Sequence, residues 1–258
     1  MARKIVNKAF IAMDYLEKQK EEIEFWKTSP LENPLEFTIE NLVNKMSEAK
    51  LLLNKLNRYK ELINNKNVVL ELGGGQGWAS CILKKYLLNE RSLVINSDIS
   101  KYAVPACHNW EYIFRTNLDS LVCKSYEIPL KSNSIDLLFT FQSAHHFIKH
   151  RSTIKEIYRI LKPGGICLYL NEPSCRRYIY PLAYKRVNKK RPNVSEDVLV
   201  WKEILYLAET TGFNVTAHYD TSFINQNPLE TIYYYILSKI IVFKYFLPGG
   251  MDYVFVKS

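Results

Sequence analysis

The sequence predicts an α/β protein built on a doubly wound, mainly parallel sheet of seven strands. Short apolar runs alternate along the chain with segments whose apolar residues recur at helical spacing, as expected of strands joined by crossover helices. Valine, isoleucine and leucine are frequent in these runs, which is typical of strands buried on both faces. The expected strands lie at about 68–72, 93–98, 120–124, 134–141, 166–170, 213–215 and 252–256.

Helices are expected in the intervening segments. Apolar residues recur at helical spacing over 5–26 and about 37–63, so residues 1–64 are predicted to form an N-terminal helical cap before a main domain at 65–258. Pro163-Gly164-Gly165 ends a helix predicted over 151–161. The other predicted helices begin at Trp78 or cover about 100–115, around Pro105, and 196–210.

Composition limits the class of protein. The chain has 258 residues, is 47% hydrophobic and carries a formal charge of +9, which is a mild indication of anionic partners. Its five cysteines lack metal-binding spacing, so neither a disulfide framework nor a metal site is predicted. Asp14 interrupts the N-terminal apolar run too early for a signal peptide, and no apolar run reaches transmembrane length. We therefore expect a cytoplasmic protein.

A glycine turn follows the first predicted strand. Four glycines separate that strand from the helix beginning at Trp78, and such a turn brings backbone N–H groups close to a ligand. A P-loop is excluded because no Gly-Lys-Ser/Thr follows, and Trp78 stands where a dinucleotide fingerprint requires a small residue. A purely structural turn is the alternative. The glycines are Gly73, Gly74, Gly75 and Gly77.

Asp98 ends the next predicted strand, about 20 residues beyond the turn. An acid at this position can accept both hydroxyls of a ribose, although Asp98 could equally cap the segment that follows. Together with the glycine turn, it favours a ligand that contains adenosine.

Four segments resemble class I S-adenosylmethionine-dependent methyltransferases of the type 11 branch, which includes ubiquinone and menaquinone methyltransferases. Their order and spacing match the family over about 65–173. The resemblance implies a Rossmann-like fold, S-adenosylmethionine as cofactor, and methyl transfer. The segments are Glu71-Leu72-Gly73-Gly74-Gly75-Gln76-Gly77, Ile128-Pro129-Leu130 with Asn133-Ser134-Ile135-Asp136, Ala144-His145-His146, and Glu156-Ile157-Tyr158-Arg159-Ile160-Leu161-Lys162-Pro163-Gly164-Gly165.

The resemblance also implies roles for individual residues. The glycine turn would lie against the methionine end of the cofactor, and Glu71 would orient the turn or the amino group. Asp98 would hold the ribose hydroxyls and Ile99 would contact the adenine. Lys124 stands where the family usually has an acid that reads the adenine amino group, so Ser125 or a backbone carbonyl is expected to replace it. The residues expected beneath the sulfonium are Phe141 and Gln142.

Methyl transfer is an in-line displacement that needs alignment and a nucleophile able to lose a proton. His145 and His146 follow a strand end, where open α/β sheets bind ligands. We predict His145 as base or acceptor ligand and His146 as an acceptor ligand; the alternative is a structural hydrogen bond to a loop. Glu172 would bind an acceptor hydroxyl or cation, or cap the following helix.

A basic insert is predicted at about 174–195, where no acid lies between Glu172 and Glu196. Arg176 and Arg177 would bind an anionic acceptor, since arginine pairs with phosphate or carboxylate through two hydrogen bonds. A solvated helix face is the alternative. Residues 230–247 are apolar almost all round, which favours packing on the sheet or a homodimer interface, with peripheral membrane contact as the alternative.

The sequence therefore predicts methyl transfer to a small or sugar-type acceptor, at oxygen. A quinone-like or natural-product acceptor is the alternative within enzymes, and a non-catalytic cofactor-binding subunit is the alternative outside them. Nucleic acid is disfavoured because the positive charge does not gather into a recognised RNA-binding module.

Overall fold

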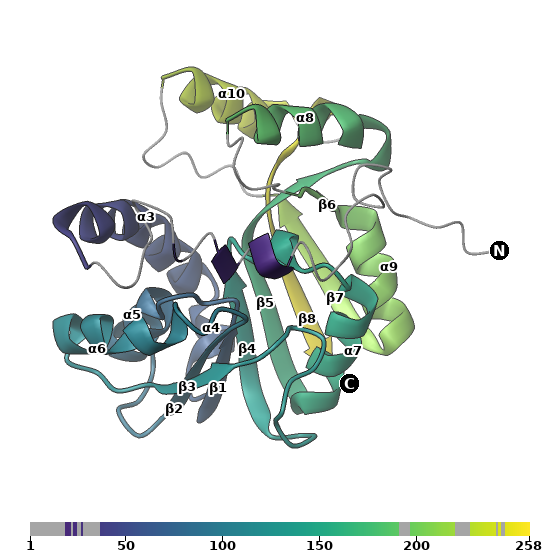
Figure 1. Ribbon diagram of the computed structural model, residues 1–258. Helices are drawn as coiled ribbons and strands as arrows, with labels where there is room; N and C mark the ends of the chain where they lie inside the picture. The colour runs from purple at the N-terminus through teal and green to yellow at the C-terminus, as the bar shows by residue number, and fades with distance from the viewer. Residues whose placement is uncertain are drawn as a thin grey trace.

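The computed structural model describes residues 19–21, 23, 24, 27, 37–190, 197–219, 228–240, 242, 243 and 246–258. Its centre is one mixed sheet in the order β3-β2-β1-β4-β5-β8-β7, with the short β6 paired to β5 (Figure 1). Among the described strands, β8 runs antiparallel to both its neighbours, β5 and β7, and all other pairs are parallel. The doubly wound, mainly parallel sheet is confirmed. The strands are β1 Val68–Leu72, β2 Leu93–Asp98, β3 Asp119–Val122, β4 Ile135–Phe141, β5 Leu161–Cys175, β6 Leu199–Val200, β7 Phe213–Tyr219 and β8 Gly249–Lys257.

Helices cover both faces of this sheet (Figure 1). One face carries α3 (Ile39–Arg58), α4 (Lys60–Ile63), α5 (Trp78–Leu87) and α6 (Cys107–Phe114). The opposite face carries α7 (His150–Ile160) and α9 (Trp201–Thr211). Each helix contributes aliphatic or aromatic side chains to the cluster on its own face, which makes the sheet the middle layer of three.

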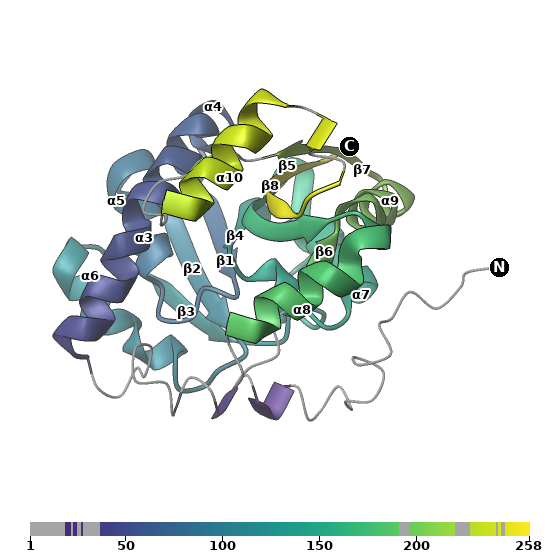
Figure 2. The ribbon, with the colours of Figure 1, turned by 90° about the horizontal axis from the view of Figure 1, so that it is seen from above.

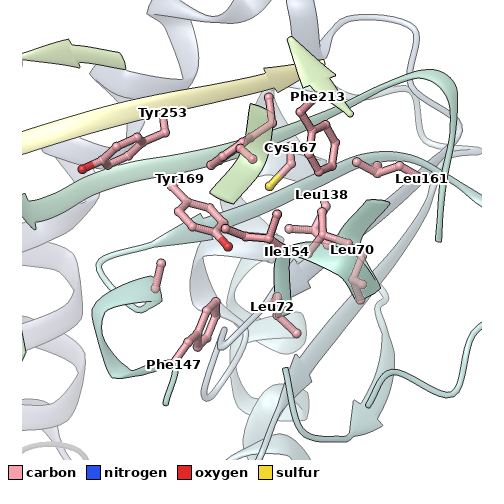
Figure 3. Close-up of a cluster of buried hydrophobic side chains, with 14 of the residues drawn as sticks. Leu70, Leu72, Leu138, Phe147, Ile154, Leu161, Cys167, Tyr169, Phe213 and Tyr253 are labelled. Atoms are coloured by element: carbon pink, nitrogen blue, oxygen red, sulfur yellow. The ribbon is translucent and has the colours of Figure 1, made fainter. Parts of the chain in front are cut away.

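Alternation along the central strands feeds both clusters. On β5, Cys167 and Tyr169 belong to the cluster under α7 and α9, whereas Leu168 and Leu170 belong to the one under α3 and α5. Tyr169 contacts Phe147 edge-on, with ring centroids 6.3 Å apart, and Figure 3 shows both rings in the cluster under α7 and α9. The core therefore extends to the loop that follows β4.

Two further helices lie beyond the carboxyl ends of the parallel strands. They are α8 (Tyr180–Lys190), which follows the short turn η3 (Arg177–Ile179), and α10 (Pro228–Lys239). Figure 1 draws both above the sheet, and Figure 2 shows them from above on the two sides of this edge. Within the described ranges, no helix combines the length and hydropathy needed to cross a bilayer.

Some boundaries differ from the sequence prediction. The helix expected over 196–210 begins only at Trp201, because Leu199 and Val200 pair with the end of β5. The helix expected over 100–115 begins at Cys107, after a short turn η1 (Val104–Ala106) that contains Pro105. Most of the helix predicted over 5–26 lies outside the described residues, and the domain boundary at 64 stays a prediction.

Candidate active site

The glycine turn joins β1 to α5 at the carboxyl edge of the sheet. Gly73, Gly75 and Gly77 have φ values of +74°, +53° and +77°, which residues with a Cβ atom rarely adopt. A Cβ on Gly73 would lie 2.6 Å from Ser143 Oγ, and one on Gly74 would lie 2.1 Å from Asn96 Oδ1. These glycines are therefore required by neighbouring protein atoms, a reason that the sequence alone did not indicate.

Glu71 is a buried acid beneath this turn. Its carboxylate accepts a hydrogen bond from Ser80 Oγ on α5 at 2.5 Å. Burial raises the pKa of Glu71 from 4.5 to about 7, and the nearby negative charge of Asp98 acts in the same direction, while the bonds to Ser80 oppose it. Glu71 therefore changes its charge close to neutral pH.

Asp98 is tied to the glycine turn. Its carboxylate accepts from the backbone N–H of Gly75 at 2.9 Å and from that of Ser100 at 2.8 Å. Asn96, fully buried on the same strand, donates to the carbonyl oxygen of Gly75 at 2.9 Å. The end of β2 and the turn after β1 thus form one hydrogen-bonded unit, in which Asp98 also caps the chain after β2.

The ends of β4 and β5 carry unusual backbone conformations. Gln142, directly after β4, and Asn171, near the end of β5, have φ values of +51° and +56°. Non-glycine residues in this region cost free energy and concentrate at functional sites. Phe141 is buried and meets Trp78 edge-on, with ring centroids 5.8 Å apart. The β4 terminus therefore packs against the start of α5, beside the glycine turn.

Glu172 on β5 holds the loop that carries the two histidines. Its Oε1 accepts from Thr140 Oγ1 and from the backbone N–H groups of Ser143 and Ala144, at 2.9–3.1 Å. Its Oε2 accepts from the backbone N–H of His145 at 3.1 Å and lies 2.8 Å from His145 Nδ1. Both side chains are buried. Burial opposes ionisation, but His145 and the backbone donors outweigh it and lower the pKa of Glu172.

The histidine loop also contacts the glycine turn. Ser143 Oγ donates to the carbonyl oxygen of Leu72 at 3.1 Å, directly before Gly73. The His146 ring lies 4.1 Å from that of His145, centroid to centroid. The structure thus brings together the predicted Glu71, Asp98, Phe141, His145 and Glu172, around the glycine turn at one edge of the sheet.

Comparison with known proteins shows which domains this part of the chain is similar to. A family model described as a methyltransferase domain matches residues 70–169, from β1 to β5. Residues 70–169 are a class I methyltransferase domain. The malonyl-[acyl-carrier protein] O-methyltransferase of a Marinomonas species is 31% identical over 104 residues, which are 40% of this chain and 37% of that protein. The ubiquinone/menaquinone biosynthesis C-methyltransferase of Wigglesworthia glossinidia brevipalpis is 24% identical over 146 residues, 51% of this chain and 58% of that protein.

Solved structures extend the likeness in fold to most of the chain. Geranyl diphosphate C-methyltransferase of Streptomyces coelicolor superposes with a TM-score of 0.62 and 13% identity, covering 93% of this chain and 96% of that one. At this identity the likeness is one of fold. The matches to both curated relatives span less than two thirds of their lengths, so they describe the methyltransferase domain and not the whole protein.

Three further residues singled out by the sequence have partners or surroundings that the structure describes. Ile99 is half-buried after β2. Ser125 Oγ lies 2.9 Å from Thr153 Oγ1 on α7, and Lys124, in place of the family's usual acid, pairs with Glu127 at 3.3 Å. No adenine contact follows from these bonds, so the role of Ser125 stays a prediction.

The two arginines of the predicted insert face α9. Arg177 pairs with Glu203, and the Arg176 guanidinium lies 4.4 Å from the centre of the Trp201 ring. Both carboxylate oxygens of Glu172 bind the protein, and β5 continues past it, so it caps no helix; its contact with the acceptor stays a prediction. Sequence reasoning also missed Asn96 and Ser143. A polar residue inside the apolar β2 run was the signal for Asn96; Ser143 gave none.

Proposed function

We propose that this protein binds S-adenosylmethionine at the glycine turn and transfers its methyl group to oxygen on a small or sugar-type acceptor. One observation carries the proposal: the His145–Glu172 pair at 2.8 Å, on a loop that contacts the glycine turn. A histidine held by an ionised carboxylate is an arrangement suited to removing a proton from a hydroxyl.

The residues of the turn fit this cofactor. S-adenosylmethionine is a sulfonium that supplies the methyl group, and it carries ribose hydroxyls and an amino group. Asp98, at the end of β2, would hold the hydroxyls, and Glu71 with the turn would orient the amino end. Phe141 and Gln142 would lie beneath the sulfonium. Two buried acids, Asp98 and Glu172, supply negative charge that favours a cationic ligand, and Glu71 adds to this charge when it is ionised.

Glu172 would position the base and set its tautomer. The lowered pKa of Glu172 keeps it ionised, so His145 Nδ1 carries the proton of their shared hydrogen bond. The other ring nitrogen, Nε2, is then the basic one and would accept the acceptor's proton. A general base contributes about 10²–10⁴-fold to the rate. His146 would contact the acceptor beside it.

The basic insert gives less support for an anionic acceptor than the sequence suggested, because Arg177 is paired with Glu203. The methyltransferase domain resembles both O- and C-methyltransferases. A quinone-like acceptor is therefore the second candidate, favoured by the similarity to the ubiquinone/menaquinone biosynthesis C-methyltransferase. In both cases the acceptor must lose a proton, which is the step assigned to His145.

The experiment separates cofactor binding from turnover. We expect S-adenosylmethionine at 100 times its Kd to stabilise the fold by about 2.7 kcal/mol in a thermal shift. Acceptors found by a mass-shift screen then serve to measure turnover. His145→Ala should lower turnover by about 10²–10⁴-fold with little change in cofactor affinity. Glu172→Gln should lower it less and shift the acidic limb of the pH–rate profile.

The matched control is His108→Ala, on the exposed side of α6. It should change neither turnover nor cofactor affinity. Absence of any thermal shift with S-adenosylmethionine or its demethylated product would contradict the cofactor assignment. Cofactor binding without turnover on any acceptor would favour a non-catalytic subunit, and full turnover in His145→Ala would remove His145 from the mechanism.

A further inference from the structure

The outward face of α10 is a stripe of exposed aliphatic side chains. Leu229, Ile232 and Ile236, with Ile240 directly after the helix, recur at helical spacing and expose 80%, 56%, 38% and 45% of their surface. Leu237, on another face of the helix, is fully buried. An amphipathic helix of a globular protein normally turns its apolar stripe toward the core. The stripe on α10 faces away from the protein and has no function in the site described above.

The apolar surface continues onto the neighbouring segment. Tyr178 in η3 and Leu182 in α8 are exposed, as are Val242, Phe243 and Phe246 after α10. Tyr178 and Phe246 have ring centroids 6.3 Å apart, and the Arg186 guanidinium on α8 lies 5.2 Å from the centre of the Tyr233 ring on α10. The first contact joins η3 to the segment after α10, and the second joins α8 to α10, so we treat the exposed side chains of these segments as one surface. We call it the helix-pair surface, which consists of the exposed side chains of Tyr178, Leu182, Lys185, Arg186, Lys189, Leu229, Ile232, Tyr235, Ile236, Lys239, Ile240, Val242, Phe243 and Phe246.

Positive charge lies beside this apolar surface. Lys185, Arg186 and Lys189 on α8 and Lys239 at the end of α10 are exposed. The sequence of η3 and α8 contains no acid. Arg177 is not included among these cations, because Glu203 neutralises its charge. Exposed cations on the same face as exposed aliphatic side chains are typical of helices that lie in the headgroup region of an anionic membrane.

We propose that the helix-pair surface docks on an anionic lipid membrane. The aliphatic side chains would enter the boundary between headgroups and acyl chains, while the lysines and arginine would contact lipid phosphates. A second copy of this chain suits the surface less well, because a two-fold dimer through this surface would bring the same cations together.

The position of the helix-pair surface determines how the candidate site would be oriented on a membrane. Figures 1 and 2 show α8 and α10 over the carboxyl edge of the sheet, where the glycine turn and the histidine loop lie. Docking would therefore turn the site toward the bilayer. The proposal concerns binding alone and does not depend on the acceptor or on methyl transfer.

Co-sedimentation with large vesicles tests the proposal. The full chain should bind vesicles of phosphatidylcholine mixed with phosphatidylglycerol, bind pure phosphatidylcholine weakly, and lose affinity as salt rises. Leu229→Ser with Ile232→Ser, and separately Lys185→Glu with Lys189→Glu, should each weaken binding to the anionic vesicles by at least about tenfold.

Matched controls lie on other helices. Tyr112→Ser with Ile113→Ser replaces two exposed apolar residues of α6, and Arg151→Glu with Lys155→Glu reverses two exposed cations on α7 at the same four-residue spacing. Both should bind like the wild type. Thermal melts and the cofactor-induced shift establish that every variant is folded, independently of lipid.

Three outcomes would overturn the proposal. The first is no binding of the folded wild type to anionic vesicles at low salt. The second is binding that the helix-pair variants and the controls change equally, which would assign it to general surface charge. The third is a dimer in sedimentation velocity without lipid that is lost in Leu229→Ser with Ile232→Ser, which would assign the surface to a second copy.

Discussion

Single side chains organise the candidate site, and Glu172 does so most directly. A buried ionised carboxylate is costly unless its oxygens accept several hydrogen bonds. Glu172 accepts from Thr140, from the backbone of Ser143, Ala144 and His145, and from the His145 ring. One charge therefore fixes both the course of the loop after β4 and the orientation of the proposed base.

Glu71 makes stability depend on pH near neutrality. Its pKa is 4.5 when exposed and about 7 in the fold. Between these values the folded chain holds a proton that the unfolded chain has released, so the contribution of Glu71 to stability is highest below pH 4.5 and is lost as pH rises through 7. The loss from this group is up to about 3 kcal/mol, at one pKa unit per 1.36 kcal/mol.

The measurement is the free energy of unfolding of wild type and Glu71→Gln between pH 4.5 and 8, without cofactor. Glutamine can still accept from Ser80 but does not ionise. We expect the variant to gain stability relative to the wild type as pH rises, with most of the change below pH 7.5. Parallel curves for the two proteins would show that Glu71 does not titrate in this range.

At the scale of elements, Gly74 in the glycine turn and Gly164 after α7 differ in what an added methyl group would contact. A Cβ on Gly74 would lie 2.1 Å from Asn96 Oδ1 and 2.6 Å from Glu71 Cδ. A Cβ on Gly164 would have no heavy atom within 4 Å, although φ there is +71°. The first position is limited by packing and the second by backbone conformation.

We therefore expect Gly74→Ala to destabilise the fold by about 1–3 kcal/mol through overpacking and to remove the thermal shift given by S-adenosylmethionine. Gly164→Ala should cost about 1–2 kcal/mol and leave that shift unchanged. Urea unfolding and thermal shift with the cofactor measure the two effects. Cofactor binding by Gly74→Ala at wild-type affinity would contradict the role given to the close packing of the turn.

The elements were largely predictable because their signals are local. Buried apolar runs fixed the main strands, and Pro163-Gly164-Gly165 marked the end of α7 within a few residues. The pairing of β6 with β5 was not predictable. The sequence around Leu199 and Val200 has helical spacing, and these residues form a strand because the end of β5 lies beside them. The same holds for Glu172 and His145, which are 27 residues apart in sequence and meet only through the β4–β5 pairing.

The insert shows the opposite limit. A basic run predicted free cations, but Arg177 meets Glu203 on α9, and only the fold determines which acid lies nearby. The apolar segment at 230–247 predicted packing or an interface; the structure puts its aliphatic stripe outside. Composition showed that the first segment is basic and the second apolar, but it could not predict which residues each segment packs against.

On the scale of the whole molecule, the N-terminal helices are joined to the far strands through a buried ion pair. Lys55 Nζ on α3 lies 2.6 Å from Asp252 Oδ1 on β8, and both side chains are almost fully buried. Asp252 also accepts from Tyr59 Oη and from the backbone N–H of Asn171, near the end of β5. The pair thus connects α3, β8 and the carboxyl edge that carries the site.

Removing Lys55 should therefore destabilise the entire domain. Lys55→Met leaves Asp252 buried without its main partner, which costs about 3–5 kcal/mol. Adding Asp252→Asn to Lys55→Met should recover part of the loss, because the asparagine is neutral and can still accept from Asn171. Arg58→Met is the matched control: Arg58 lies 3.8 Å from Asp252 but is 46% exposed, so its loss should cost about 1 kcal/mol or less.

Urea unfolding followed by circular dichroism and tryptophan fluorescence measures these differences. Because α3 shares a core with α5 and is bonded to β8, we expect one cooperative transition that moves as a whole to lower urea in Lys55→Met. A separate early transition in Lys55→Met, with the main transition unmoved, would instead mean that residues 1–64 unfold as an independent cap.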